Sequence, residues 1–214
     1  MKKLFIFDCD GTLIDSEILA CQVLTQAWAE HGVHVSPDEF LLKVVGKGGN
    51  DPFVQSIHSR LGPEARRKAD EELEQEFEKN LAPVRGIKAV LDDLIGQLCV
   101  ASNSSPDYVF RALKNTGLDP YFEDRVFSSH QLKKPKPAPD LFLHALKILQ
   151  CPAKEAIVIE DSASGILAAQ NAGVEVVAFM GGRHFKPENK KNLLSLGADH
   201  YCNDTNELRA VLFS

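Results

Sequence analysis

The alternation of short apolar runs with stretches of helical periodicity after residue 83 constrains the fold of this chain more than any other feature. Each short apolar run predicts a buried strand, and each stretch that follows it predicts a helix. Repeated strand–helix units favour a parallel sheet with helices on both faces. The expected strands are residues 98–101, 125–127, 156–159 and 174–179, and the expected helices are residues 106–115, 140–149, 164–171, 188–196 and 206–212.

A further buried strand is expected at residues 4–7, which form a continuous apolar run. Helical patterns then fill the chain up to residue 82, and helices are expected at residues 15–30, from residue 37, at 53–61 and at 63–80. The second of these helices begins after Ser36 as N-cap, with Pro37 in its first turn and Glu39 completing a capping box. The sequence therefore predicts an α/β protein with a doubly wound, Rossmann-like parallel sheet. Its core would comprise residues 1–14 and 83–214, and an α-helical cap domain would be inserted at residues 15–82.

Composition and charge exclude several classes of partner. The formal net charge is −6, so we expect no basic face for nucleic acid or anionic lipid. No apolar run approaches the length of a membrane span. The five cysteines are odd in number and never spaced as a C-x-x-C pair, which favours a reducing cytoplasm over a disulfide frame or zinc site. A cytoplasmic monomer acting on a small molecule is the expectation.

Polar residues follow the expected strands at the edge where such a sheet binds ligands. Asp8 and Asp10 come directly after the first strand, and their i, i+2 spacing lets both side chains reach the same side. Gly11 permits a sharp turn beside them. The residues gathered at this edge are Asp8, Asp10, Ser102, Asn103, Glu160 and Asp161, with Lys136 on a proline-rich loop at 133–140.

Four carboxylates this close together would repel each other unless a cation lay among them. Oxygen ligands of this kind are typical of magnesium sites. The Ser102 hydroxyl and the Lys136 ammonium could bind a phosphoryl group opposite the metal. Uncatalysed hydrolysis of phosphate monoesters is extremely slow, and charge neutralisation with a covalent intermediate is one solution. The pattern therefore favours magnesium-dependent phosphoryl transfer.

Four motifs in this order resemble those of the haloacid dehalogenase superfamily of phosphatases. Residues 7–17 (FDCDGTLIDSE) are similar to the first motif, and Ser102 after an apolar strand to the second. Residues 136–140 (KPAPD) and 158–162 (VIEDS) resemble the third and fourth. The likeness extends from residue 4 to about residue 182. The helical insertion after the first motif resembles the subfamily that includes β-phosphoglucomutase and the 6-phosphogluconate phosphatases.

The resemblance implies a role for each matched residue. Asp8 would be the nucleophile that becomes an aspartyl-phosphate, and Asp10 the general acid and base. Mg²⁺ would be the cofactor, held by Asp8, the backbone carbonyl of Asp10, Asp161 and Glu160. The phosphoryl oxygens would be bound by Ser102, Lys136 and the backbone amides near Gly11 and Asn103.

Several residues keep an alternative interpretation at this point. Lys134 also precedes a proline and rivals Lys136, and Asp161 could instead be the N-cap of the following helix. Lys47, in the glycine-rich segment 46–50, is a substrate-binding candidate, although the segment fits a simple connector equally well. Asn50 shares that segment. Arg183-His184 follows a strand end, near enough to touch a substrate, although a solvent-exposed loop is the expectation.

Three other functions compete with a phosphatase that acts on small phosphomonoesters such as sugar or sugar-acid phosphates. A phosphomutase of the β-phosphoglucomutase type would share the core, but the resemblance would place a histidine on the first cap helix, where this chain has Ala20. A dehalogenase of the same fold would lack the second aspartate, Asp10. A non-enzymatic phospho-aspartate switch would carry no helical insertion, and its aspartate would follow a middle strand of the sequence.

Overall fold

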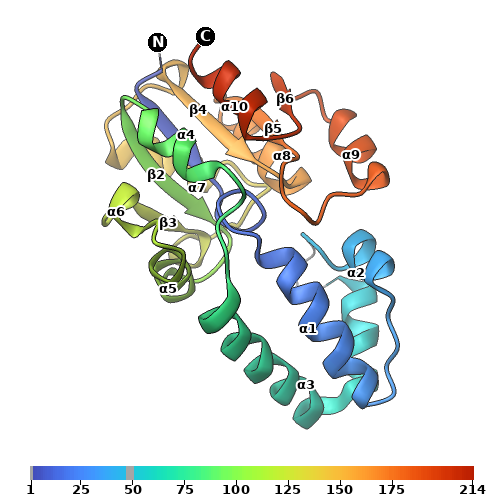
Figure 1. Ribbon diagram of the computed structural model, residues 1–214. Coiled ribbons are helices and arrows are strands. Elements are labelled where there is room, and N and C mark those ends of the chain that lie inside the picture. Colours follow the sequence, from blue (N-terminus) through green and yellow to red (C-terminus); the bar gives the residue numbers. More distant parts are fainter. Residues whose placement is uncertain (1, 47–50) are drawn as a thin grey trace.

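A six-stranded parallel sheet forms the centre of the protein (Figure 1). The computed structural model describes residues 2–46 and 51–214. The strand order is β3-β2-β1-β4-β5-β6, so sheet growth changes direction at β1 and opens a crevice at the carboxyl ends of β1 and β4. The predicted fold class is confirmed. The strands are β1 (Leu4–Phe7), β2 (Gln97–Ser102), β3 (Val126–Ser128), β4 (Ala156–Glu160), β5 (Glu175–Phe179) and β6 (His200–Cys202).

Alternate residues of β1 enter two apolar cores, one on each face of the sheet. Phe5 and Phe7 join a cluster with residues of α4, α5, α6 and α10, whereas Leu4 and Ile6 join one with residues of α7, α8 and α9. Burial on both faces explains why β1 is apolar throughout. These helices are α4 (Ile87–Asp93), α5 (Pro106–Thr116), α6 (Asp119–Phe122), α7 (Asp140–Ile148), α8 (Ala163–Asn171), α9 (Pro187–Leu194) and α10 (Thr205–Leu212).

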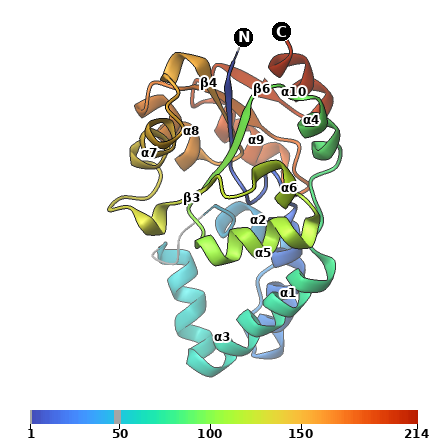
Figure 2. The same ribbon diagram turned by 90° about the vertical axis from the view of Figure 1, so that its left-hand side faces the viewer.

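Three further helices, α1 (Ser16–Glu30), α2 (Pro37–Lys43) and α3 (Pro52–Asn80), lie together beneath the sheet in Figures 1 and 2. They enclose an apolar cluster of their own, in which the Trp28 and Phe40 rings lie 5.6 Å apart. Trp28 is therefore a packing residue. We refer to these three helices as the cap helices.

The chain passes between the sheet and the cap helices twice, and the two crossings lie side by side. Asp15 N donates to Ala82 O at 2.9 Å, and Val84 N donates to Leu13 O at 2.9 Å. Because the first crossing comes directly after the turn that follows β1, the first cap helix begins at Ser16, soon after Asp8 in the chain. The N-terminus of α1 is thus placed beside the carboxyl ends of the strands.

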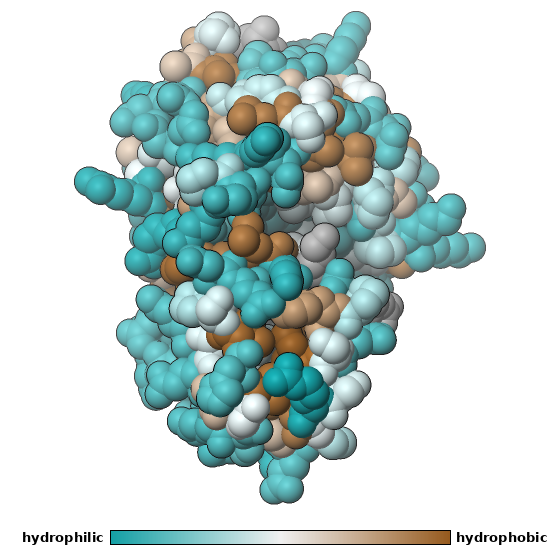
Figure 3. All heavy atoms as spheres, turned by 90° about the vertical axis from the view of Figure 1, so that its right-hand side faces the viewer, coloured by the Kyte–Doolittle hydropathy of each residue, from teal (hydrophilic) through white to brown (hydrophobic). Residues whose placement is uncertain are grey.

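Hydrophilic side chains cover most of the face seen in Figure 3, and hydrophobic side chains form small groups between them. Among the described residues, no helix combines the length and the apolar character that crossing a membrane would require.

Candidate active site

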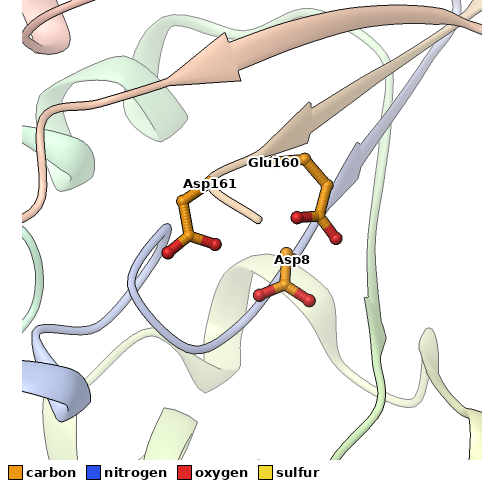
Figure 4. A group of neighbouring side chains, drawn as sticks. All are labelled: Asp8, Glu160 and Asp161. Atoms are coloured by element: carbon orange, nitrogen blue, oxygen red, sulfur yellow. The ribbon is translucent and has the colours of Figure 1, made fainter. Parts of the chain in front are cut away.

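Three carboxylates meet where β1 and β4 end (Figure 4). Asp8 follows β1, Glu160 is the last residue of β4, and Asp161 comes next. One oxygen from each carboxylate lies within 4.8 Å of the others. All three side chains are buried. Burial raises the pKa of Asp8 well above its usual value, and the Glu160 and Asp161 charges add to this, although Lys136 partly opposes it.

Lys136 lies against two of these carboxylates. Its Nζ is 2.7 Å from Asp8 Oδ1 and 2.5 Å from Glu160 Oε1, and it donates to Ala101 O at 2.7 Å. Burial works to lower the pKa of Lys136, but the two carboxylates outweigh it and raise that pKa, so the side chain is an ammonium. Lys134 is exposed. The structure therefore places Lys136, and not its rival, beside Asp8.

Asn103 holds the Lys136 loop in place through two hydrogen bonds. Lys136 N donates to Asn103 Oδ1 at 3.0 Å, and Asn103 Nδ2 donates to Lys136 O at 3.4 Å. Ser102 is buried beside it, and its Oγ accepts a hydrogen bond from Ser104 N at 3.0 Å. The end of β2 and the proline-rich loop are thus joined next to Asp8.

The residues at this edge fit a hard divalent cation. Asp8, Glu160 and Asp161 offer three oxygen donors, and one ammonium balances only part of their charge. Two glycines leave the space that these carboxylates occupy. A Cβ at Gly165 would lie 1.8 Å from Glu160 Oε1, and a Cβ at Gly11 would lie 2.0 Å from Asp161 Oδ2. The donor set and the space around it therefore suit Mg²⁺.

Asp161 does not cap the helix that follows it. Ser162 is the N-cap residue of α8, and its Oγ accepts from Gly165 N at 3.0 Å. Asp161 instead accepts from Thr12 Oγ1 at 3.3 Å and lies 3.2 Å from His184 Nε2. The Asp161 carboxylate is thus directed toward the turn after β1.

The expectation that Arg183-His184 is an exposed loop is wrong for His184, which is only 2% exposed. The chain after β5 folds back over Gly11, and a Cβ there would lie 2.8 Å from His184 Cε1. Burial works to lower the pKa of His184, but its bond to Asp161 outweighs this and raises that pKa. Arg183 does point outward, and its Nε donates to Asp15 Oδ2 at 2.9 Å.

The Asp10 carboxylate is held by three hydroxyl groups. Ser16 Oγ donates to Asp10 Oδ1 at 2.8 Å, Tyr108 OH to the same oxygen at 2.7 Å, and Ser104 Oγ to Oδ2 at 2.8 Å. Burial and the Asp10 charge raise the pKa of Tyr108 well above its usual value, so its hydroxyl keeps the proton it donates. Sequence reasoning missed all three hydroxyls, because no spacing rule relates them to Asp10.

Two clefts lie beside the candidate active site, one at Asp10 and one at Lys136. One, of about 380 Å³, is lined by Asp10, Glu17, Ala20 and Tyr108 together with Ser16, Phe77, Ser104, Ser105 and His130. The other, of about 610 Å³, is lined by Lys136, Asn103, His130 and other residues.

Burial raises the pKa of Glu17 to about 8, and the Asp10 and Asp161 charges contribute. Lys47 and Asn50, two candidates for substrate contact, lie outside the described residues.

The chain is similar in sequence and structure to known hydrolases. A family model described as "Haloacid dehalogenase-like hydrolase" matches residues 5–179. A 6-phosphogluconate phosphatase from Escherichia coli (strain K12) is 28% identical over 85% of this chain and 84% of its own length. Hexitol phosphatase A from the same organism is 32% identical over 82% of each chain. A haloacid dehalogenase-like protein of unknown function from Agrobacterium tumefaciens str. C58 has a TM-score of 0.89 at 32% identity, covering 100% of this chain and 98% of that one. With the family model spanning most of the chain, this protein belongs to the haloacid dehalogenase-like hydrolases.

Proposed function

We propose that this protein is a Mg²⁺-dependent phosphatase that hydrolyses small phosphomonoesters through an aspartyl-phosphate on Asp8. The observation that carries the proposal is the Asp8 carboxylate, which is in contact with Lys136, adjoins two further carboxylates and is two residues from an oriented Asp10. A nucleophile, a cation for the phosphoryl group and an acid–base group are what covalent phosphoryl transfer requires.

In the first step an Asp8 oxygen attacks phosphorus, the new O–P bond forms, and the ester P–O bond breaks. Asp10 gives its proton to the departing alkoxide. Lys136, Ser102 and backbone N–H groups near Gly11 and Asn103 donate to the phosphoryl oxygens, whose charge is largest in the transition state. Asp10 then takes a proton from a water molecule, whose oxygen attacks phosphorus and frees Asp8 and inorganic phosphate.

Asp8, Asp161, Glu160 and the backbone carbonyl of Asp10 would hold the Mg²⁺ ion. When bound, the ion neutralises the charge of the phosphate and of the surrounding carboxylates, so that an anionic nucleophile can approach an anionic substrate. Thr12 and His184 orient Asp161, and the Ser162 N–H and hydroxyl, at 3.0 and 2.9 Å, fix Glu160 Oε2. These contacts keep the carboxylates in place before the ion enters.

Phosphorylated sugars, sugar acids or sugar alcohols are the proposed substrates. The two relatives described above are named for phosphatase activity on 6-phosphogluconate and on hexitol phosphates. The cleft at Asp10 supports this class, because its lining is rich in hydroxyl and carboxyl groups that can bind a polyhydroxylated leaving group. Since the cap helices lie next to this edge of the sheet (Figure 2), a compact monoester suits the site better than a folded phosphoprotein.

A mutase is the main alternative, and one position disfavours it. Ala20 of α1 faces the cleft beside Asp10, where the mutase resemblance would place a histidine. A mutase must protect its aspartyl-phosphate from water until the intermediate has turned around, and a methyl group cannot take part in that control. Hydrolysis therefore remains the proposed outcome, with inorganic phosphate as the product.

A phosphate-release screen over a panel of sugar, sugar-acid and sugar-alcohol phosphates tests this function. We expect turnover that requires Mg²⁺ and is abolished in Asp8→Asn, whose side chain is nearly isosteric and leaves the fold intact. Phosphate release that survives either the substitution or thorough chelation would contradict the mechanism. Incubation with β-glucose 1-phosphate and a bisphosphate primer distinguishes the mutase, because that enzyme would form glucose 6-phosphate faster than inorganic phosphate.

A further inference from the structure

The three hydroxyls around Asp10 come from three separate parts of the chain. Ser16 begins α1, Ser104 lies in the loop after β2, and Tyr108 is in the first turns of α5. Each donates to Asp10 at 2.7 or 2.8 Å. One donor therefore comes from the cap helices and two come from the sheet side. Such convergence on one carboxylate fixes both the direction and the rotation of the carboxylate plane.

The three bonds are divided unequally between the two oxygens of Asp10. Among the described residues, Oδ1 accepts from both Ser16 and Tyr108, whereas Oδ2 accepts only from Ser104. A carboxylate offers about four lone-pair positions, two on each oxygen. The positions on Oδ1 are filled, and residues 2–46 and 51–214 leave one position on Oδ2 open. Asp10 also lines the 380 Å³ cleft in which a leaving group would lie.

We propose that Tyr108 and Ser104, together with Ser16, are positioning residues that hold Asp10 so that Oδ2 exchanges the proton with the leaving group and with water. We call these three side chains the hydroxyl clamp. The inference rests on the proposed function, because it assigns a purpose to the orientation of the same acid–base group. The proton leaves Oδ2 when the ester P–O bond breaks and returns to Oδ2 from the attacking water.

Packing fixes Tyr108 so that it can act in this way. Its ring lies 5.9 Å from the Phe77 ring of α3, at an interplanar angle of 46°. Phe77 and Tyr108 together line the cleft that contains Asp10. The hydroxyl clamp is thus supported from the cap helices at two points, through Ser16 on α1 and through Phe77 on α3.

The leaving group provides a readout that a merely structural role would not change. An alkoxide is a poor leaving group and needs the proton of Asp10, whereas 4-nitrophenolate leaves readily without it. The value of kcat/KM includes only the steps up to ester cleavage. For Tyr108→Phe and Ser104→Ala we expect kcat/KM to fall about tenfold with an alkyl phosphate and less than about twofold with 4-nitrophenyl phosphate.

Three variants serve as references in this experiment. Asp10→Asn sets the largest loss that misplacing the acid can cause. Tyr121→Phe is the matched control, because the Tyr121 hydroxyl bonds to Asp92, away from the carboxylate group, and its loss should change neither rate. Tyr108→Phe in the Asp10→Asn background should cause no further loss, since the two side chains then act as one unit.

Each outcome separates the inference from the proposed function. If Asp10→Asn shows no dependence on the leaving group, the acid–base assignment itself is wrong. If Asp10→Asn shows that dependence but Tyr108→Phe and Ser104→Ala do not, only the hydroxyl clamp is overturned. An equal loss with both substrates in the clamp variants also overturns it, because such a loss reports damage to the site as a whole.

Discussion

Gly165 leaves the space that the Glu160 carboxylate occupies in the proposed metal site. An alanine inside a helix is normally more stable than a glycine by about 1 kcal/mol. At this position of α8, however, the added Cβ would lie 1.8 Å from both Glu160 Cδ and Oε1. We predict that Gly165→Ala displaces the Glu160 carboxylate, weakens Mg²⁺ binding by about tenfold or more and brings no gain in stability.

Mg²⁺ titration followed by calorimetry, together with thermal unfolding, measures both effects. Glu160→Ala is the matching background, because it removes the group that the methyl would strike. In that background Gly165→Ala should stabilise the protein as helix propensity predicts. Unchanged Mg²⁺ affinity of the single Gly165→Ala variant would contradict the prediction.

Glu17 gives a pH dependence whose sign follows from its pKa of about 8 in the folded protein, against an ordinary value of 4.5. Between these two values the folded chain holds a proton that the unfolded chain has released, so this group makes stability fall as the pH rises. Glu17→Gln removes the effect. The variant should equal the wild type below about pH 4.5 and exceed it by about 2 kcal/mol above pH 8, since partial exposure to water screens the full linkage.

Urea unfolding across this pH range, in protein kept free of metal by a chelator, tests the prediction. Glu30→Gln, at the exposed end of the same helix, is the matched control. An identical pH profile for Glu17→Gln and wild type would show that Glu17 is ionised in the folded protein.

The residues that could be predicted are those that directly follow a strand. Asp8, Glu160 and Asp161 end apolar runs, and a parallel sheet brings such ends together whatever the loops do. Lys136 required the family motif to separate it from Lys134. His184 could not be predicted, because its burial depends on the loop after β5 folding over Gly11, in the turn after β1. The contact of Tyr108 with Asp10 could not be predicted for a similar reason, since it depends on the packing of α5.

At the scale of elements, strongly patterned segments were predicted within a few residues, whereas several short ones were missed. The Ser36 cap is present, with Ser36 Oγ accepting from Glu39 N at 3.2 Å. The two helices expected on either side of residue 62 are joined as α3, but Gly62 at φ 74° breaks its helical geometry. The sequence pattern did not predict α4, α6 or β6, because three to seven residues carry too little periodicity and their formation depends on packing against the sheet.

At the scale of the whole molecule, we propose that residues 15–82 form a cap domain. We expect this cap to close over the edge of the sheet by motion at the two crossings. Two contacts bridge the cap helices and the region of α9: Asn189 Nδ2 donates to Leu41 O at 2.9 Å, and Lys186 Nζ lies 3.2 Å from Asp38 Oδ1. If closure orders the site, removing both contacts with Asn189→Ala and Asp38→Ala should lower kcat/KM several-fold at nearly unchanged stability.

Fluorescence energy transfer between labels on α3 and α7 would report the accompanying change in cap position. Arg67→Ala is a suitable control, because the ion pair of Arg67 with Glu71 lies within α3 and does not connect the cap helices to α9. A loss of kcat/KM in the double variant without any change in the distance distribution would assign these contacts to local packing rather than to closure.

The adjacency of the two crossings has a consequence for how such a molecule can diversify. The hydrogen bond from Asp15 N to Ala82 O joins the first and last residues of the insertion. The chain therefore enters and leaves the cap helices at one place beside the sheet. A segment of different length or shape could be inserted between these two crossings without altering the sheet, its strand order or the carboxylates at its edge. We therefore predict that substrate selectivity can be changed without changing the chemistry at the sheet edge, and a chimaera that exchanges the residues between the two crossings tests this.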